Sequence, residues 1–141
     1  MINAAIVGIG NWGQLLVSSV QNNSSVTFTK GVTRTKSKAV EFCATNNIEI
    51  VDDYDTLLAD PSIDAIVLAT PHTQHAGQIV AAAEAGKHVF AEKPPGRCLK
   101  DIQIIREQEV KSPHSKLMFG FNHRYHPGIM RAKSFTFQCV N

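Results

Sequence analysis

The 141-residue sequence predicts an α/β fold in which a Rossmann-type, doubly wound parallel sheet of about six strands lies between two helical layers, a three-layer αβα arrangement. Three observations lead to this prediction. Strand-like and helix-like segments alternate along almost the whole chain. Residues 65–70 form an unbroken apolar run, which is typical of a strand buried on both faces. The first apolar segment runs directly into the glycine pattern Gly8-x-Gly10-x-x-Gly13.

The N-terminal half is predicted to hold three strands and three helices. The strands cover about residues 3–8, 26–33 and 48–51, and the helices about residues 12–21, 37–45 and 54–60. On the first helix we expect Leu15, Leu16 and Val20 to face the sheet. Ser37 is the expected N-cap of the second helix. Residues 22–25 are all Asn or Ser, so we expect a loop there.

The C-terminal half continues the alternation. Strands are predicted at residues 65–70, 87–91 and 117–121, and helices at about residues 74–85 and 99–110. Gly86 is the expected stop of the first of these helices. On the second we expect Ile102, Ile105 and Val110 to point inward. Two prolines should stiffen the loop at residues 92–96.

Composition and charge exclude several classes of protein. The chain is 43% hydrophobic and 18% charged, a profile typical of globular domains. Its net charge of +2 is too small to indicate a nucleic-acid or membrane-surface partner. No apolar run approaches the roughly 18–20 residues of a membrane span, and no basic segment precedes the first apolar run as in a signal peptide. We therefore expect a cytoplasmic protein without nucleic-acid or membrane partners, and self-association is possible.

Three widely spaced cysteines, Cys43, Cys98 and Cys139, fit free thiols of a reducing compartment better than a disulfide framework or a zinc site. His72 and His75 lie three residues apart, but a metal site needs a third ligand at suitable spacing. We therefore predict no metal site. His75 is expected to contact either a cofactor or an adjacent loop.

The glycine pattern at the end of the first strand predicts a dinucleotide site. Gly8 would make the tight turn, Gly10 would let the backbone approach a pyrophosphate, and Gly13 would let helix and strand pack closely. The following helix offers free N–H groups and a partial positive charge to the phosphates. The alternative is a tight turn with no ligand. Trp12, inside the turn, does not suit a core position and would cover the cofactor or pack on a neighbouring domain.

The end of the second predicted strand bears on the choice of cofactor. Versions of this unit that bind NAD carry an acidic residue there, which binds the ribose 2′-hydroxyl. Thr33 takes that place here, and Arg34, Lys36 and Lys38 follow. Guanidinium, ammonium and hydroxyl groups suit a 2′-phosphate, so we predict NADP in preference to NAD. The alternative is a set of solvated cations on an exposed loop.

Other polar residues follow the later strands, whose carboxyl ends should meet at the same edge of the sheet. They are Thr70, Pro71, His72, Glu92, Lys93, Asn122 and Arg124. Lys93 is the strongest candidate for chemistry, because an ammonium there could orient a nicotinamide and polarise or protonate a substrate oxygen. The alternative is a surface Glu–Lys pair of no consequence.

Taken together, these segments resemble the Gfo/Idh/MocA family of NAD(P)-dependent oxidoreductases over about residues 1–133. Five stretches carry the resemblance: the glycine loop at residues 8–13; Tyr-Asp-Thr-Leu-Leu-Ala-Asp-Pro at 54–61, leading into residues 63–66; Ala-Thr-Pro-His at 69–72 with His75; Ala-Gly-Lys-His-Val at 85–89 running into Glu-Lys-Pro at 92–94; and Gly-Phe-Asn-His-Arg-Tyr-His-Pro at 120–127.

The resemblance implies hydride transfer between a nicotinamide cofactor and a sugar, polyol or similar small substrate. It implies that Lys93 is the catalytic or nicotinamide-positioning lysine. The expected cofactor-binding residues are Gly8, Ile9, Gly10, Asn11, Trp12, Gly13, Thr33, Arg34, Lys38, Thr70, Pro71, His72, His75, Glu92, Lys93, Asn122 and Arg124.

The resemblance also implies two parts to the chain: a NAD(P)-binding domain at residues 1–122, and a truncated start of the linker to a missing substrate domain at residues 123–141. Phe135 and Phe137 alternate with polar residues, which predicts a strand instead of a continuing helix. We expect little or no turnover from the isolated chain. The alternative function is a non-catalytic dinucleotide-binding module or sensor.

Overall fold

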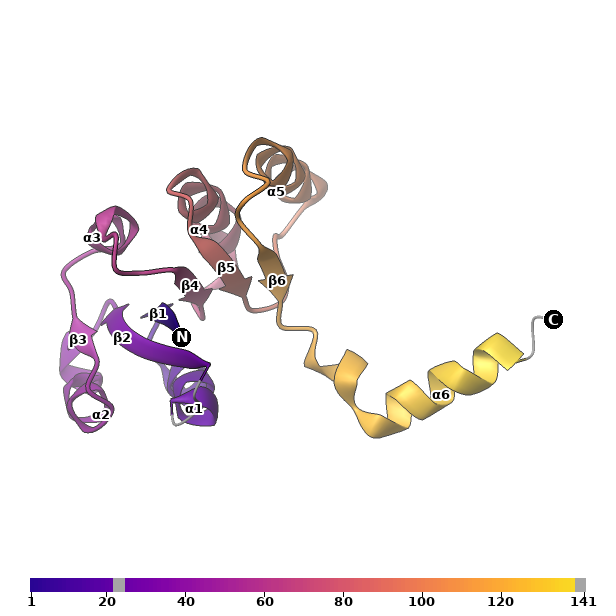
Figure 1. Cartoon of the computed structure of the whole chain (residues 1–141), viewed down its shortest axis with the longest axis horizontal. Coiled ribbons are helices and arrows are strands. Elements are labelled where there is room, and N and C mark those ends of the chain that lie inside the picture. Colours follow the sequence, from indigo (N-terminus) through magenta and orange to yellow (C-terminus); the bar gives the residue numbers. More distant parts are fainter. Residues whose placement is uncertain (22–24, 139–141) are drawn as a thin grey trace.

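Six parallel strands form one sheet in the order β3-β2-β1-β4-β5-β6 (Figure 1). The computed structural model describes residues 1–21 and 25–138. The strands are β1 (Ile2–Val7), β2 (Val26–Val32), β3 (Glu49–Ile50), β4 (Ala65–Leu68), β5 (His88–Ala91) and β6 (Leu117–Phe119). This order is that of a doubly wound Rossmann sheet, and it confirms the predicted fold class. Most of the expected loop at residues 22–25, and Cys139, lie outside the described residues.

Helices cover both faces of the sheet (Figure 1). One face carries α1 (Asn11–Val20), the short 3₁₀ turn η1 (Lys36–Lys38) and α2 (Val40–Thr45). The other face carries α3 (Tyr54–Ala59), α4 (His72–Glu84) and α5 (Leu99–Lys111). Gly86 has a φ of 75° just beyond α4, as expected of a helix stop. A second 3₁₀ turn, η2 (Asn122–Tyr125), leads into α6 (Pro127–Gln138), which projects away from the sheet (Figure 1).

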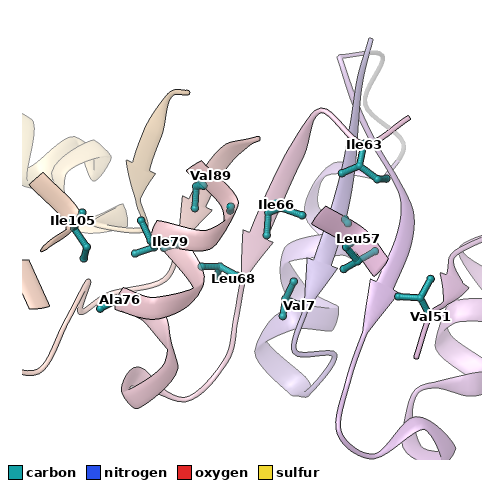
Figure 2. Packing of buried hydrophobic residues seen from close by; sticks show 13 residues of the cluster. Val7, Val51, Leu57, Ile63, Ile66, Leu68, Ala76, Ile79, Val89 and Ile105 are labelled. Atoms are coloured by element: carbon teal, nitrogen blue, oxygen red, sulfur yellow. The ribbon is translucent and has the colours of Figure 1, made fainter. Parts of the chain in front are cut away.

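Two apolar clusters hold the three layers together. Figure 2 shows the first, in which Ile66 and Leu68 of β4 pack with Leu57 of α3 and Ile79 of α4. The second joins the opposite side of β1 to α1 and α2 through Ile6, Val17 and Cys43, among others. Because β1 and β4 contribute to both clusters, they are buried on both faces. Their carboxyl ends are therefore held firmly at the centre of the sheet.

The apolar face of α1 differs from the prediction. Val17 and Gly13 are buried, and Leu16 packs beside them, but Leu15 is 54% exposed. Gly13 and Val17 stand one turn apart, whereas Leu15 is about 200° around the helix from each of them. The expectation that Leu15 faces the sheet is therefore wrong, because the close approach of Gly13 sets which side of the helix meets the strands.

A similar correction applies to α5, where Ile105 is buried as expected but Val110 is 81% exposed. The inward position is taken by Gln108, which lies three residues after Ile105. Its amide donates a hydrogen bond to Ser112 Oγ at 2.9 Å, so the polar group has a partner. A polar residue with a local partner thus occupies a core-facing position that the apolar pattern did not predict.

Two predicted boundaries are also wrong. Ser37 lies inside η1 and is not an N-cap, because α2 begins after Ala39 without a side-chain cap. Residues 134–138 continue α6 and do not form a strand. Pro127 starts this helix at the position where proline is most easily accepted, and a few alternating residues do not interrupt it. Over the described part of the chain, no helix has the length and apolar character needed to cross a membrane.

Lys87 makes a buried contact at the edge of the sheet opposite the carboxyl ends of the strands. It is 7% exposed, and its Nζ donates hydrogen bonds to the carbonyl oxygens of Asp60 (2.6 Å) and Ile63 (2.9 Å). The same Asp60 pairs through its carboxylate with Lys30 at 2.7 Å, which holds the pKa of that carboxyl below its usual range. The turn between α3 and β4 is therefore held by two lysines.

We expect Lys87→Met to lower the free energy of unfolding by about 1–3 kcal/mol, because two buried carbonyl groups would lose their donor. Urea denaturation measures this change. Lys116→Met, at an exposed lysine, is the matched control and should change stability by no more than about 0.5 kcal/mol. Equal stability of the two variants would show that the Lys87 contacts contribute nothing.

Candidate functional site

Two adjoining clefts lie beyond the carboxyl ends of the strands, where the strand order reverses between β1 and β4. The larger cleft, of about 470 Å³, is lined by residues that follow β1, β2 and β4 and by parts of α3 and α4. The smaller cleft, of about 380 Å³, is lined by residues that follow β4, β5 and β6 and by Trp12. Ala69 and Thr70 line both clefts, so the two adjoin at the end of β4.

The glycine loop forms the inner wall of the larger cleft. Gly8 has a φ of +93°, and a Cβ there would lie 2.6 Å from the carbonyl oxygen of Ala69. A Cβ at Gly13 would lie 2.0 Å from the carbonyl oxygen of Gly8, so only glycine lets α1 approach β1 this closely. A Cβ at Gly10 would meet nothing within 4 Å. Gly10 therefore borders open space at the start of α1.

The N-terminus of α1 fits a pyrophosphate group. Gly10 is the N-cap and has no side-chain cap, and the first turn carries no acidic residue. The first hydrogen bond of the helix runs from Gln14 N–H to Gly10 O at 2.9 Å. The earlier N–H groups of the turn have no intrahelical acceptor, and they carry the positive end of the helix dipole. Donors, charge and open space thus coincide where phosphate oxygens would lie.

The end of β2 gives the larger cleft its positive charge. Thr33, Arg34, Thr35 and Lys38 line it, and no carboxylate is among the described residues that do so. Lys36 departs from the expectation of free cations, because its ammonium forms an ion pair with the carboxylate of Asp52 and does not line the cleft. Two of the three cations, Arg34 and Lys38, therefore line the larger cleft.

The opposite wall of the larger cleft is a hydrogen-bonded group that the sequence analysis missed. The Tyr54 hydroxyl donates to the carbonyl oxygen of Gln78 at 2.8 Å, and burial raises the pKa of this phenol, which keeps it protonated. Thr70 Oγ1 donates to Gln78 Oε1 at 2.6 Å. Oε1 of Gln74, one turn earlier in α4, accepts a hydrogen bond from Gln78 Nε2 at 3.4 Å. The spacing of the two glutamines, four residues apart after a strand end, was the available signal.

The smaller cleft gathers titratable and aromatic side chains. Its lining residues are Trp12, Ala69, Thr70, His72, Glu92, Lys93, Asn122 and His123. Lys93 is exposed, whereas Glu92 is only 8% exposed and accepts a hydrogen bond from the backbone N–H of Lys93 at 3.3 Å. A Cβ at Gly120 would lie 2.7 Å from Glu92 Oε1. Glu92 is thus packed against the chain, and the alternative of a surface Glu–Lys pair is wrong.

Three of the expected cofactor-binding residues do not line either cleft. Gly13 acts through its packing on Gly8. Arg124 is exposed, and its guanidinium lies 5.9 Å from the centre of the Tyr125 ring. His75 is completely buried, with both ring nitrogens next to backbone carbonyl groups of Thr70 and Pro94. Of the two roles expected for His75, contact with an adjacent loop is therefore the one that the structure shows.

Metal-binding and thiol groups contribute nothing further to the clefts. Within residues 1–21 and 25–138, no group of three His, Cys, Asp or Glu side chains is placed to hold a metal ion. Cys43 and Cys98 are free thiols, and burial raises the pKa of Cys43. Neither cysteine lines a cleft. The lysine and arginine side chains that line the clefts, in the part of the chain that the structure describes, are Arg34 and Lys38 in the larger cleft and Lys93 in the smaller.

Comparisons with known proteins agree with this geometry. The family model described as "Oxidoreductase family, NAD-binding Rossmann fold" matches residues 2–121. The chain is 33% identical over 139 residues to the uncharacterized oxidoreductase YrbE of Bacillus subtilis. It is 32% identical over 138 residues to the scyllo-inositol 2-dehydrogenase (NAD(+)) of the same organism. Each alignment covers 94% of this chain and 39% of the relative.

A solved structure shows the same fold. The scyllo-inositol dehydrogenase of Lactobacillus casei, with bound NAD(H) and scyllo-inositol, superposes with a TM-score of 0.91 at 25% identity. The superposition covers 98% of this chain and 41% of that protein. The chain thus spans about two fifths of the length of the relatives that it matches.

Proposed function

The chain belongs to the Gfo/Idh/MocA family of oxidoreductases and has its NAD-binding Rossmann fold, and from that premise we propose that it binds NADP in preference to NAD and serves hydride transfer with a sugar, polyol or similar alcohol. The observation that carries this proposal is the pair of adjoining clefts at the reversal of strand order. The larger cleft carries the positive charges of Arg34 and Lys38, and the smaller cleft carries the exposed ammonium of Lys93. A dinucleotide with an extra phosphate matches that distribution of charge.

Each part of the coenzyme has a matching group in this arrangement. The N-terminus of α1, next to Gly10, would hold the pyrophosphate. Arg34 would bind the 2′-phosphate through two parallel N–H groups, and Lys38 would add a second positive charge. Residues of the smaller cleft, among them Thr70 and Lys93, would hold the nicotinamide. Lack of a carboxylate at position 33 supports NADP over NAD.

Lys93 is proposed as the catalytic residue. The bound coenzyme supplies the hydride acceptor or donor. Lys93 follows β5, and its backbone N–H is held by the buried carboxylate of Glu92. Its ammonium is exposed in the smaller cleft, where it can donate hydrogen bonds to a substrate hydroxyl or carbonyl oxygen and move a proton at that oxygen. Asn122 and His123 add polar groups to the same wall.

The relatives support the proposed substrate class and the proposed division of the chain. Inositol dehydrogenases act on a small polyol, and we propose a sugar or polyol substrate for the whole protein. Residues 1–122 form the coenzyme-binding domain in this proposal, and residues 123–141 begin the linker to a substrate domain. The exposed and projecting α6 supports the second assignment (Figure 1).

A coenzyme-binding module without turnover is the second candidate function. The exposure of Lys93 favours it, because the described residues leave water in contact with the reacting end of the site. A steady-state assay of the purified 141-residue chain with NADP and a panel of polyols tests whether this chain alone has turnover. We expect no turnover above background from this chain, and robust turnover would contradict that expectation.

Coenzyme binding can be tested through Trp12, the only tryptophan, which is 46% exposed and lines the smaller cleft with Lys93. We expect saturable quenching of its fluorescence by NADPH. Lys93→Ala should weaken NADPH binding by roughly 10-fold, because one hydrogen bond from a charged group, about 1.5 kcal/mol, is lost.

The matched control for this titration is Lys100→Ala, at an exposed lysine of α5 that lines neither cleft, which should bind NADPH as the wild type does. An equal effect of both substitutions would show that Lys93 does not contact the coenzyme. Absence of quenching at saturating NADPH would refute the proposed site.

A further inference from the structure

Gly120 follows the edge strand β6, and its backbone lies directly against the carboxylate of Glu92. β5 and β6 are neighbours in the sheet (Figure 1), and the Gly120 N–H donates to the carbonyl oxygen of Ala91 at 2.9 Å. A Cβ at Gly120 would lie 2.7 Å from Glu92 Oε1, 3.0 Å from Cδ and 3.1 Å from Oε2. The Glu92 carboxylate therefore fills the space that a side chain at residue 120 would need.

This contact differs from that of Gly13 in what would have to move. A Cβ at Gly13 meets backbone atoms of Gly8, whereas the three atoms nearest to a Cβ at Gly120 form the far end of a side chain. The φ of Gly120 is not positive, so alanine could adopt the same backbone conformation. We therefore expect a protein with alanine at residue 120 to fold, with the Glu92 carboxylate displaced.

The Glu92 carboxylate also has acceptor capacity that the protein leaves unused. Glu92 is 8% exposed and lines the smaller cleft beside Lys93 and Asn122. A carboxylate can accept about four hydrogen bonds. Among residues 1–21 and 25–138 this one accepts a single bond, from the Lys93 N–H at 3.3 Å, and forms no ion pair. Buried polar groups are normally paired, so the remaining lone pairs indicate donors from a ligand in the cleft.

We propose that Gly120 is a positioning residue: its missing side chain lets the Glu92 carboxylate lie at the wall of the smaller cleft, where it accepts hydrogen bonds from hydroxyl groups of the nicotinamide half of the coenzyme. A ribose offers neighbouring hydroxyl donors to the two carboxylate oxygens. The methyl group of Gly120→Ala would displace the carboxylate from this position. The identity of the ligand rests on the proposed function, whereas the contact between Gly120 and Glu92 does not.

Two ligands separate a local effect at the smaller cleft from a general loss of structure. NADPH contains the nicotinamide ribose, whereas adenosine 2′,5′-bisphosphate contains only the adenosine half with two phosphates and should need only the larger cleft. In calorimetric titrations we expect Gly120→Ala to weaken NADPH binding by roughly 10-fold, as for loss of one hydrogen bond to a charged group. Its affinity for the bisphosphate should equal that of the wild type. Gly77→Ala, where a Cβ would meet nothing within 4 Å, should change neither affinity.

A double-variant cycle tests whether Gly120 acts through Glu92. Glu92→Ala removes the carboxylate and leaves room for a methyl group at residue 120. Gly120→Ala should therefore weaken NADPH binding in the wild-type background and have no further effect in the Glu92→Ala background. Thermal unfolding of the same four proteins without ligand should show the same coupling. Gly120→Ala should lower the unfolding midpoint more in the wild-type background than in the Glu92→Ala background.

Every outcome bears on one part of the proposal. Normal NADPH binding by Gly120→Ala would overturn the positioning role. Failure of that variant to fold, or an equal loss of both ligands, would also overturn it, because the glycine would then serve only the fold. Equal effects of Gly120→Ala in the two backgrounds would show that it does not act through Glu92. Failure of the wild-type protein to bind NADPH would refute the proposed function, while the unfolding cycle would still test the contact.

Discussion

Gly13→Ala is expected to unfold the chain or to destabilise it by about 3 kcal/mol or more, whereas Gly10→Ala is expected to leave the fold intact and to remove most of the coenzyme affinity. The two glycines belong to one motif, but their surroundings differ. A methyl group at Gly13 would lie 2.0 Å from the carbonyl oxygen of Gly8, and neither backbone segment can yield without separating α1 from β1. A methyl group at Gly10 meets no protein atom within 4 Å.

The expected loss of affinity in Gly10→Ala follows from the same open space. The new methyl group would stand where phosphate oxygens approach the first turn of α1, and it would displace them from the N–H donors. Loss of one hydrogen bond to a charged group, about 1.5–3 kcal/mol, corresponds to roughly 10- to 150-fold weaker NADPH binding.

Thermal unfolding measures the stability of the Gly13→Ala and Gly10→Ala variants, and the Trp12 fluorescence titration measures their affinity for NADPH. Gly77→Ala is a useful control, because Gly77 lies in α4 at an exposed position where a Cβ would also meet nothing within 4 Å. It should keep the affinity of the wild type. A stable Gly13→Ala protein, or a Gly10→Ala protein that binds NADPH normally, would contradict the assignment of the glycine loop.

The double variant Thr33→Asp, Arg34→Ala is expected to reverse the choice of coenzyme. Arg34 lines the larger cleft and can bind a 2′-phosphate through two N–H groups. Its removal should cost NADPH about 2–3 kcal/mol, or roughly 30- to 150-fold in affinity. A carboxylate at position 33 would accept a hydrogen bond from the ribose 2′-hydroxyl of NADH and repel a 2′-phosphate. The ratio of the two dissociation constants, from Trp12 titrations, measures the reversal.

Lys36→Ala is the matched control for this experiment. Lys36 carries the same charge two residues away, but it is paired with Asp52 and lies outside the larger cleft. Its substitution should leave the preference for NADP within about twofold of the wild type, in line with the small energies of exposed ion pairs. Equal or tighter binding of NADH than NADPH by the wild-type protein would overturn the proposed preference.

Much of the fold could be predicted from local pattern. The alternation of strands and helices, the unbroken apolar run of β4 and the stop at Gly86 all depend on short segments, and each has its expected place in the structure. Which side chains of a helix pack against the sheet was less predictable. Leu15 and Val110 are apolar but exposed, and Gln108 is polar but buried, because packing against the sheet sets the orientation of each helix.

The candidate site likewise has features that local sequence predicts and others that depend on packing. The glycine loop and the strand ends could be found along the chain, because a parallel sheet brings the carboxyl ends of its strands to one edge. The pairing of Lys36 with Asp52 could not, since the two residues follow different strands, β2 and β3. The Gln78 contacts with Tyr54 and Thr70 were missed because they join α4 to α3 and to the end of β4.

Local sequence was therefore enough to predict the order of the elements, the glycine turn at the first strand and the lack of an acidic residue after the second. These features depend on residues close together in the chain, where backbone preferences and periodicity act. The folded arrangement was needed to show which charges line the clefts, that Glu92 is buried against Gly120, and that His75 joins Thr70 to Pro94. Those contacts join residues separated along the chain, and they depend on how separate loops meet once the core is packed.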